Sequence, residues 1–141
     1  MSEARAERLA ALLDAIPYIR FLGMRAELAG DEMTAILPFA ERLVGNASVP
    51  ALHGGVVGAF MEMTALAQLA IAEPSMRQPK AIDVTIEYLR PAKRFTTFAR
   101  ADVRKSGRRV ANVHVEAWQE ERSAPVAFLR GNFLLSGTSG G

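Results

Sequence analysis

The chain has 141 residues, enough for one domain with a substantial hydrophobic core. Half of its residues are hydrophobic and 23% are charged, as in soluble globular proteins, and a net charge of +2 is too weak to indicate a nucleic-acid-binding protein. Because the chain contains no cysteine, disulfides, thiolate metal sites and a cysteine nucleophile are excluded.

Residues 1–16 are predicted to form an N-terminal helix. Their larger apolar side chains recur at helical spacing, at Leu9, Leu12, Leu13 and Ile16, and Pro17 stops the pattern. The charged residues between Glu3 and Arg8 leave only a brief apolar run, which is unlike a secretion signal. We therefore expect a cytoplasmic protein.

Two strands and a loop follow this helix. Residues 24–28 alternate between apolar and charged side chains, residues 33–37 form a second apolar run, and Gly30 with Asp31 makes the turn between them. Residues 40–51 contain glycine, asparagine and proline, so they are predicted to be a loop that leads to His53.

The stretch from Gly54 to about Ala72 is predicted to be a long helix in which almost every residue is apolar or small. It begins just after His53 with two glycines, so unpaired backbone N–H groups and the positive end of the helix dipole are exposed there. A helix that is apolar on all sides must be covered on all sides, by a sheet and, we expect, by a second copy of the chain. It contains Glu62 and Gln68 and falls short of a full span, so no membrane contact is predicted.

Glu62 is the carboxylate of this helix. Counted in steps of three and four, it shares a face with Gly55, Gly58 and Ala59, whose small size would let a ligand or another segment approach closely. A buried carboxylate is unfavourable unless it is paired, hydrogen-bonded or used in chemistry. Two interpretations follow, a structural contact to an arginine or a backbone N–H, and a functional group; the His-Gly-Gly start nearby favours the second.

Four strands are predicted in the second half of the chain, over residues 82–88, 98–104, 110–119 and 126–135. In the first of them, Ile82, Val84, Ile86 and Tyr88 alternate with polar residues and should be half-buried. Ser106 and Gly107 form a turn between the cationic pairs Arg104-Lys105 and Arg108-Arg109. The Ser/Gly-rich residues 136–141 are expected to be frayed.

The order of these elements predicts an α+β fold, with an antiparallel sheet wrapped around one long central helix. Residues 1–141 should form a single domain, with residues 17–135 as its core. The two histidines and the scattered carboxylates do not have the spacing of metal ligands, so no metal site is predicted.

Three features together resemble the hotdog-fold acyl-CoA thioesterases, most closely the phenylacetic-acid-degradation type. They are the string Leu52-His53-Gly54-Gly55, the carboxylate nine residues after the histidine, and the string Glu87-Tyr88-Leu89-Arg90-Pro91-Ala92. The similarity runs from Ile19 to Leu135. It implies hydrolysis of an acyl-CoA to a free acid and coenzyme A, without a further cofactor, in a dimer or tetramer whose active sites are shared between subunits.

The resemblance also implies roles for single residues. The backbone N–H of Gly54 polarises the thioester carbonyl, and each such donor is worth about 10²–10³ in rate. Glu62 comes from the other subunit and acts as general base or nucleophile. His53 orients the carbonyl or, as the alternative, only caps the helix. Relatives carry an Asn or Gln at the position of Ala47, so Asn46, one residue earlier, would take that catalytic part only if the loop were one residue longer. Some relatives hold water with a Ser or Thr where this chain has Leu66.

The predicted substrate-binding residues match the places where the family holds coenzyme A. They are Gly55, Tyr88, Arg90, Lys105, Ser106, Gly107, Arg108 and Arg109. The alternative for the basic turn is an ordinary solvated hairpin. Phe60, Met61 and Met63 suggest an adaptable apolar pocket for an aryl or medium-chain acyl group. Packing is the alternative interpretation for Met61 and the interpretation for Trp118, and His114 is interpreted as a structural or surface residue.

Two other functions compete with hydrolysis. The first is a non-catalytic module that binds acyl-CoA, because a fold does not fix a function; Glu62 argues against it, since a sensor has no need of a buried carboxylate. The second is a hotdog hydratase or dehydratase, which needs a histidine and an acid arranged to move an α-proton. The spacing from His53 to Glu62 fits a thioesterase better.

Overall fold

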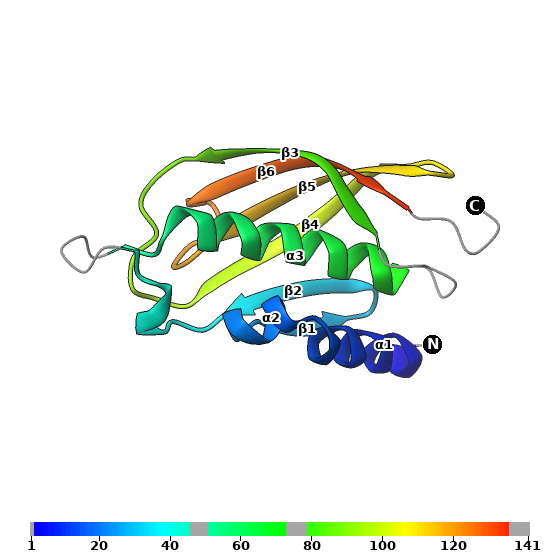
Figure 1. Ribbon diagram of the computed structural model, residues 1–141, viewed down its shortest axis with the longest axis horizontal. Helices are drawn as coiled ribbons and strands as arrows, with labels where there is room; N and C mark the ends of the chain where they lie inside the picture. The colour runs from blue at the N-terminus through cyan, green and yellow to red at the C-terminus, as the bar shows by residue number, and fades with distance from the viewer. Residues whose placement is uncertain (1, 46–50, 73–78, 136–141) are drawn as a thin grey trace.

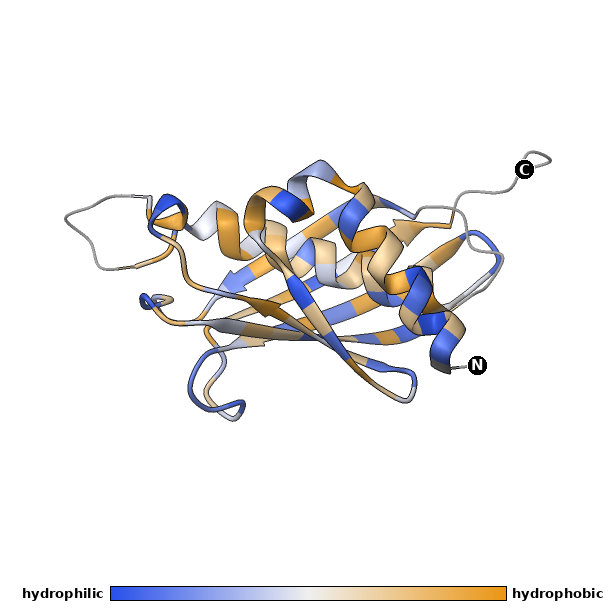
Figure 2. Cartoon of the chain, turned by 90° about the horizontal axis from the view of Figure 1, so that it is seen from below, coloured by the Kyte–Doolittle hydropathy of each residue, from blue (hydrophilic) through white to orange (hydrophobic). Residues whose placement is uncertain are grey.

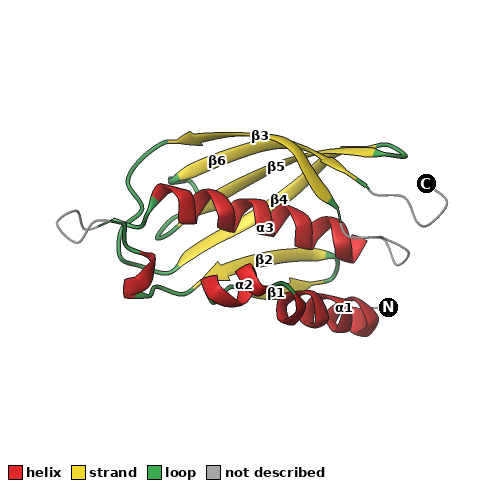
Figure 3. Cartoon of the chain, viewed as in Figure 1, coloured by secondary structure: helices red, strands yellow, loops and turns green. Residues whose placement is uncertain are grey.

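The computed structural model describes residues 2–45, 51–72 and 79–135. Its elements are α1 (Ser2–Ala15), α2 (Pro17–Leu22), β1 (Arg25–Ala29), β2 (Glu32–Leu37), the short 3-10 helix η1 (Glu41–Leu43), α3 (Gly54–Ala72), β3 (Lys80–Tyr88), β4 (Thr97–Ser106), β5 (Val110–Trp118) and β6 (Ala127–Leu134), arranged as in Figures 1 and 3. The tail predicted to fray, residues 136–141, lies outside the described part of the chain.

The strands form one antiparallel sheet in the order β1-β2-β4-β5-β6-β3. The first strand after α3 is therefore an edge strand beside the last strand of the chain, and the sheet curls around α3 (Figure 1). Hydrophobic and hydrophilic residues alternate along the strands (Figure 2), and the inward-facing ones are fully buried, among them Val113, Val115, Leu129 and Phe133. The predicted α+β fold, an antiparallel sheet around one long helix, is confirmed.

The N-terminal region contains one helix more than predicted. Pro17 does stop α1, but it is also the first residue of α2, because its fixed φ suits the first helical position and its missing N–H is not needed there. Gly23 ends α2 with a φ of 76°. Both helices contact α3 on the side that the sheet leaves open, and Arg8 donates from Nη2 to the carbonyl of Ile71, near the end of α3, at 2.9 Å.

The predicted strands match the observed ones to within two residues at each end. Gly30 makes the first hairpin turn with a φ of 69°, a conformation that glycine adopts without strain. The half-burial predicted for alternate residues of β3 is wrong at Tyr88, which is 55% exposed, and at Ile82. A register shift between Ala81 and Asp83 takes this side chain out of the pattern, and it is 54% exposed.

The central helix is covered unevenly. Phe60 and Met61 are fully buried and belong to the core, so the interpretation of Met61 as packing is confirmed and the alternative, that the two line an apolar pocket, is wrong; Met63 is half-buried. By length and composition alone α3 could cross a membrane, but more than half of it is buried in this fold. It is the core helix that the sheet and α1 enclose.

Candidate active site

The start of α3 is held by His53. Its Nδ1 accepts a hydrogen bond from the Gly55 N–H at 2.9 Å, and its carbonyl accepts from the N–H groups of Val56 and Val57 at 3.0 and 3.2 Å. His53 therefore caps the helix, which is one of its two predicted roles. Among the described residues, none accepts a hydrogen bond from the Gly54 N–H. This donor, with the helix dipole behind it, can bind an anion or a polarised carbonyl oxygen.

Glycines make room for this arrangement. A Cβ on Gly45 would lie 2.5 Å from Cδ2 of His53, so the imidazole rests against the backbone of Gly45. The sequence contained this glycine within a predicted loop, but nothing in the pattern pointed to a contact with His53. On the other side of the helix, a Cβ on Gly58 would lie 2.8 Å from Cδ1 of Ile86. The missing side chain lets β3 approach α3 closely.

Tyr88, the last residue of β3, joins that strand to the start of the helix. Its hydroxyl donates to the Gly54 carbonyl at 2.8 Å. A Cβ on Gly58 would lie 3.1 Å from the same hydroxyl oxygen, so the missing side chain of this glycine also leaves room for the tyrosine. The structure thus brings the predicted substrate-binding residues Tyr88 and Gly55 next to the predicted catalytic residues His53 and Gly54.

A cavity of about 420 Å³ opens beside Gly54. It is lined mainly by apolar side chains and by the strand end that follows β3, including Leu52, Val57, Leu89, Arg90, Pro91 and Val126. A neighbouring hollow of about 260 Å³ shares Arg90, Pro91 and Val126 and adds Lys93. An apolar cleft that is also lined by a helix N-terminus and by Arg90 suits an uncharged reacting group attached to an anionic carrier.

Glu62 lies farther along the same helix. It is half-buried in a strip of α3 with Val56, Ala59 and Met63, and it forms no salt bridge with the residues that the structure describes. Eight residues separate it from Gly54, or about 12 Å along the axis at 1.5 Å per residue. A carbonyl oxygen bound about 3 Å from the Gly54 N–H therefore lies well short of the backbone of Glu62 in the same chain.

The basic turn is not near Gly54 within one chain. Tyr88 pairs with Ala127 at one end of the sheet, whereas Lys80 and Val110 both lie opposite Leu134 at the other end. The nine residues of β3 span about 25 Å, and the turn lies beyond Val110. Gly107, Arg108 and Arg109 are exposed there, whereas the side chains of Lys105 and Ser106, and the whole of Asn46, fall outside the described part.

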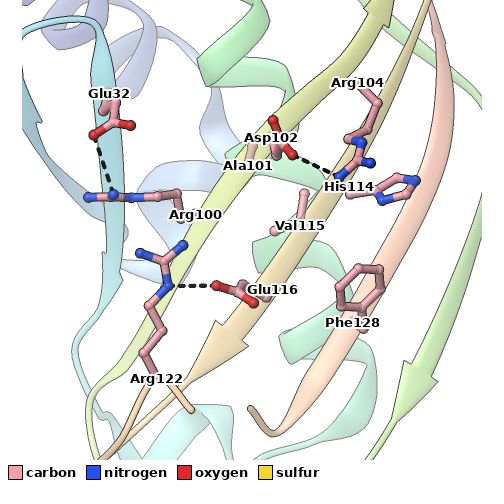
Figure 4. A pocket seen from close by; sticks show the side chains of 10 residues that line it. All are labelled: Glu32, Arg100, Ala101, Asp102, Arg104, His114, Val115, Glu116, Arg122 and Phe128. Carbon is pink, nitrogen blue, oxygen red and sulfur yellow. Dashed lines mark hydrogen bonds and ion pairs between the residues drawn. The ribbon is translucent and has the colours of Figure 1, made fainter. Parts of the chain in front are cut away.

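A second hollow, of about 460 Å³, lies on the outer face of the sheet (Figure 4). Its charges are paired with each other: Arg100 with Glu32 at 3.5 Å, Arg104 with Asp102 at 3.1 Å, and Arg122 with Glu116 at 2.6 Å. His114 packs edge-on against Phe128 and Trp118 stacks on Phe98, as their interpretation as structural residues requires. In the described ranges, no three His, Asp or Glu residues gather as metal ligands would.

Known proteins match the chain over most of its length. The model of the thioesterase superfamily matches residues 50–126. The medium/long-chain acyl-CoA thioesterase YigI of Escherichia coli K12 is 32% identical in an alignment of 124 positions, and the match covers 76% of this chain and 78% of that protein. The crystal structure of a Chromobacterium violaceum protein, 38% identical, aligns with a TM-score of 0.76 over 98% of this chain and 97% of the other.

A more distant structure shows the same fold. The Escherichia coli PaaI protein, from the phenylacetic acid degradation operon, is 19% identical and aligns with a TM-score of 0.82 over 96% of each chain. The fold expected from the His-Gly-Gly string and the strand end at residues 87–92 is thus also the fold of that protein. This chain belongs to the thioesterase superfamily, and it is a thioester hydrolase of the hotdog fold.

Proposed function

We propose that this protein hydrolyses acyl-CoA thioesters to a free acid and coenzyme A. The observation that carries the proposal is the Gly54 N–H at the start of α3, which has no acceptor among the described residues and lies beside an apolar cleft that Arg90 also lines. The thioester carbonyl oxygen would accept a hydrogen bond from this N–H, and the helix dipole would stabilise the negative charge that develops there. The name of the relative YigI supports coenzyme A as the carrier and medium or long acyl chains as the first substrates to test.

Glu62 of a partner subunit supplies the base or the nucleophile. As a base, it takes a proton from water while the water oxygen attacks the carbonyl carbon. The oxyanion formed collapses, the carbon–sulfur bond breaks, and the coenzyme A thiolate leaves and takes up a proton. As a nucleophile, Glu62 would form an acyl anhydride that water then hydrolyses. Both routes use only water and the substrate, so no cofactor is proposed.

The edge strand β3 is the proposed dimer contact. Among the described strands it pairs with β6 alone. It is nine residues long, and Ile82, Tyr88 and Leu89 at or near its ends are about half exposed. Long exposed edges of this kind usually pair or are covered. Antiparallel pairing of β3 with the partner's β3 about a two-fold axis would bring the half-buried strips of the two α3 helices together. Two such dimers would form the proposed tetramer, and we propose a cytoplasmic location.

The same two-fold axis determines which subunit binds the nucleotide end of coenzyme A. Antiparallel pairing of the two β3 strands reverses the partner's sheet, so the partner's basic turn comes to the end at which Gly54 lies. We assign the phosphate contacts to Lys105, Ser106, Gly107, Arg108 and Arg109 of this turn. Arg90 stays beside the cleft of its own chain and faces the inner part of the carrier.

A thiol-release assay with a panel of acyl-CoAs, from aryl to long-chain, tests the proposal. We expect turnover by the wild-type protein and its loss in Glu62→Gln. Tight binding of acyl-CoA without release of thiol from any substrate would instead identify a non-catalytic binding module. Hydration of an enoyl-CoA without thiol release would identify a hydratase.

A further inference from the structure

We propose that Tyr88 is a positioning residue that holds His53 in one tautomer, with its proton on Nε2, through the peptide group between Gly54 and Gly55. The inference rests on the proposed function, because it assigns His53 the part of a hydrogen-bond donor in the same site. It separates the roles of His53 and Glu62, one as donor and the other as base.

One peptide group connects the two side chains. The Tyr88 hydroxyl donates to the Gly54 carbonyl oxygen at 2.8 Å, and the N–H of that same peptide group, on Gly55, donates to Nδ1 of His53 at 2.9 Å. Both polar atoms of the peptide are therefore engaged by side chains. Hydrogen bonds in such a chain polarise one another, so the tyrosine hydroxyl strengthens the bond that the N–H makes to the imidazole.

This series of hydrogen bonds fixes which nitrogen of His53 carries the proton. Nδ1 accepts the hydrogen bond, so in the neutral imidazole the proton lies on Nε2. The exposed side chain then presents an N–H and not a lone pair. His53 can donate to an oxygen, but in this tautomer it cannot remove a proton from water or from a substrate.

The two glycines make the external contacts necessary. Consecutive glycines at a helix start lose more conformational freedom on folding than other residues, so this turn depends on contacts from outside the helix. The tyrosine ring supplies one from β3: a Cβ on Gly54 would meet Cε1 of Tyr88 at 3.6 Å. The imidazole supplies the other, against the backbone of Gly45.

The test is Tyr88→Phe, which keeps the ring and removes the hydroxyl. Tyr18→Phe is the matched control, since it is the other tyrosine of the chain and stacks on Phe21, on α2. Proton–nitrogen correlation spectra report the tautomer directly, and His114→Gln assigns the signals because the chain has two histidines. We expect wild type and Tyr18→Phe to show the proton on Nε2, and Tyr88→Phe to show a mixture.

Kinetics supply the second readout. Tyr88→Phe should lower kcat by about fivefold, the size of one ordinary hydrogen bond, with KM changed less than twofold. A His53 tautomer unchanged in Tyr88→Phe would overturn the proposal, as would a rise in KM alone, which would make Tyr88 a simple substrate contact. The spectra need no substrate, so a tautomer shift in a protein without thioesterase activity would refute the proposed function and leave the positioning role of Tyr88 standing.

Discussion

Glu62 lies eight residues after Gly54 on α3, so the two groups proposed to act on one thioester are about 12 Å apart along the helix axis. The geometry of a single chain thus separates the donor from the carboxylate. An interface between two antiparallel copies of α3 would bring Gly54 of one chain beside Glu62 of the other. Catalysis and association should therefore depend on each other.

Complementation between inactive subunits tests this dependence. Gly54→Pro removes the N–H but keeps a residue that suits the first helical position, so activity should fall by about 10²–10³ without loss of the helix. Glu62→Gln removes the carboxylate. In a mixture of the two, each hybrid dimer has one site with both wild-type groups, and random assembly should recover about a quarter of wild-type activity.

The comparison is made by co-expressing the two variants with different tags and assaying the unfractionated mixture; dimers purified on both tags are all hybrids and should show about half of wild-type activity. Either variant alone serves as the control. Recovery no greater than the sum of the single variants would place both groups in one chain. A protein that light scattering finds only as a monomer at micromolar concentration would contradict the shared site in another way.

Arg108→Ala tests the basic turn, which lies about 25 Å from Gly54 within one chain. Because this turn is proposed to bind phosphates far from the reacting carbon, KM should rise severalfold and kcat should change little. The rise should shrink at high salt, which screens exposed charges. Arg130→Ala removes the same charge from the outer face, where Arg130 pairs with Glu87 at 3.8 Å, and should leave KM unchanged. An equal rise in KM in both variants would contradict a specific phosphate site at the turn and would show that only the net charge of the protein matters.

Much of the fold could be predicted from local pattern. The β1–β2 hairpin followed from Gly30, whose positive φ closes the turn, and α3 followed from its unbroken apolar run. The helix that begins at Pro17 was missed because proline was interpreted only as an end. The exposure of Ile82 was missed because a bulge depends on how β3 pairs with β6, which no local alternation reveals.

The site could be predicted only in part, for the same reason. The His-Gly-Gly string marked the helix start, and the strand end marked Tyr88 and Arg90, but their contact is set by Gly58 and by the curl of the sheet. The hydrogen bond from Tyr88 to Gly54 spans 34 positions of sequence. No spacing rule connects residues so far apart. Phe60 was misplaced, and Met61 was left with two interpretations, because an apolar helix gives no sign of which face is inside.

Arg8→Ala tests how the N-terminal helix secures α3. Arg8 donates to the Ile71 carbonyl at 2.9 Å in a partly buried contact, and a cation near the C-terminal end of a helix also interacts well with its dipole. The free energy of unfolding should fall by about 1–2 kcal/mol in denaturant titrations. Arg5→Ala is the matched control on the same helix, because the Arg5 contact with Gly30 is exposed and 3.5 Å long. If the free energy of unfolding fell as much in Arg5→Ala as in Arg8→Ala, the cause would be the change in helix propensity and not the contact with Ile71.

Glu62→Gln separates chemistry from structure at the carboxylate. The amide has nearly the same size and hydrogen-bonding reach, but it cannot accept a proton or attack a carbonyl, so thioester hydrolysis should fall at least about 10²-fold. Acyl-CoA should still bind, which isothermal titration can measure, because the Gly54 N–H and the cleft are untouched. Glu62 forms no salt bridge with the described residues, so the substitution leaves no described charge unpaired and unfolding should shift little.

Glu62→Asp tests whether the carboxylate itself, and not the length of its side chain, is required for hydrolysis. It keeps the charge on a shorter side chain, and partial activity is expected because the carboxylate would still reach the carbonyl through a water molecule. A Gln variant that hydrolysed acyl-CoA at nearly the wild-type rate would make Glu62 a structural residue of α3. The base would then have to be sought elsewhere, and His53 in its Nε2-protonated form is not a candidate, since its acceptor nitrogen is occupied by the Gly55 N–H.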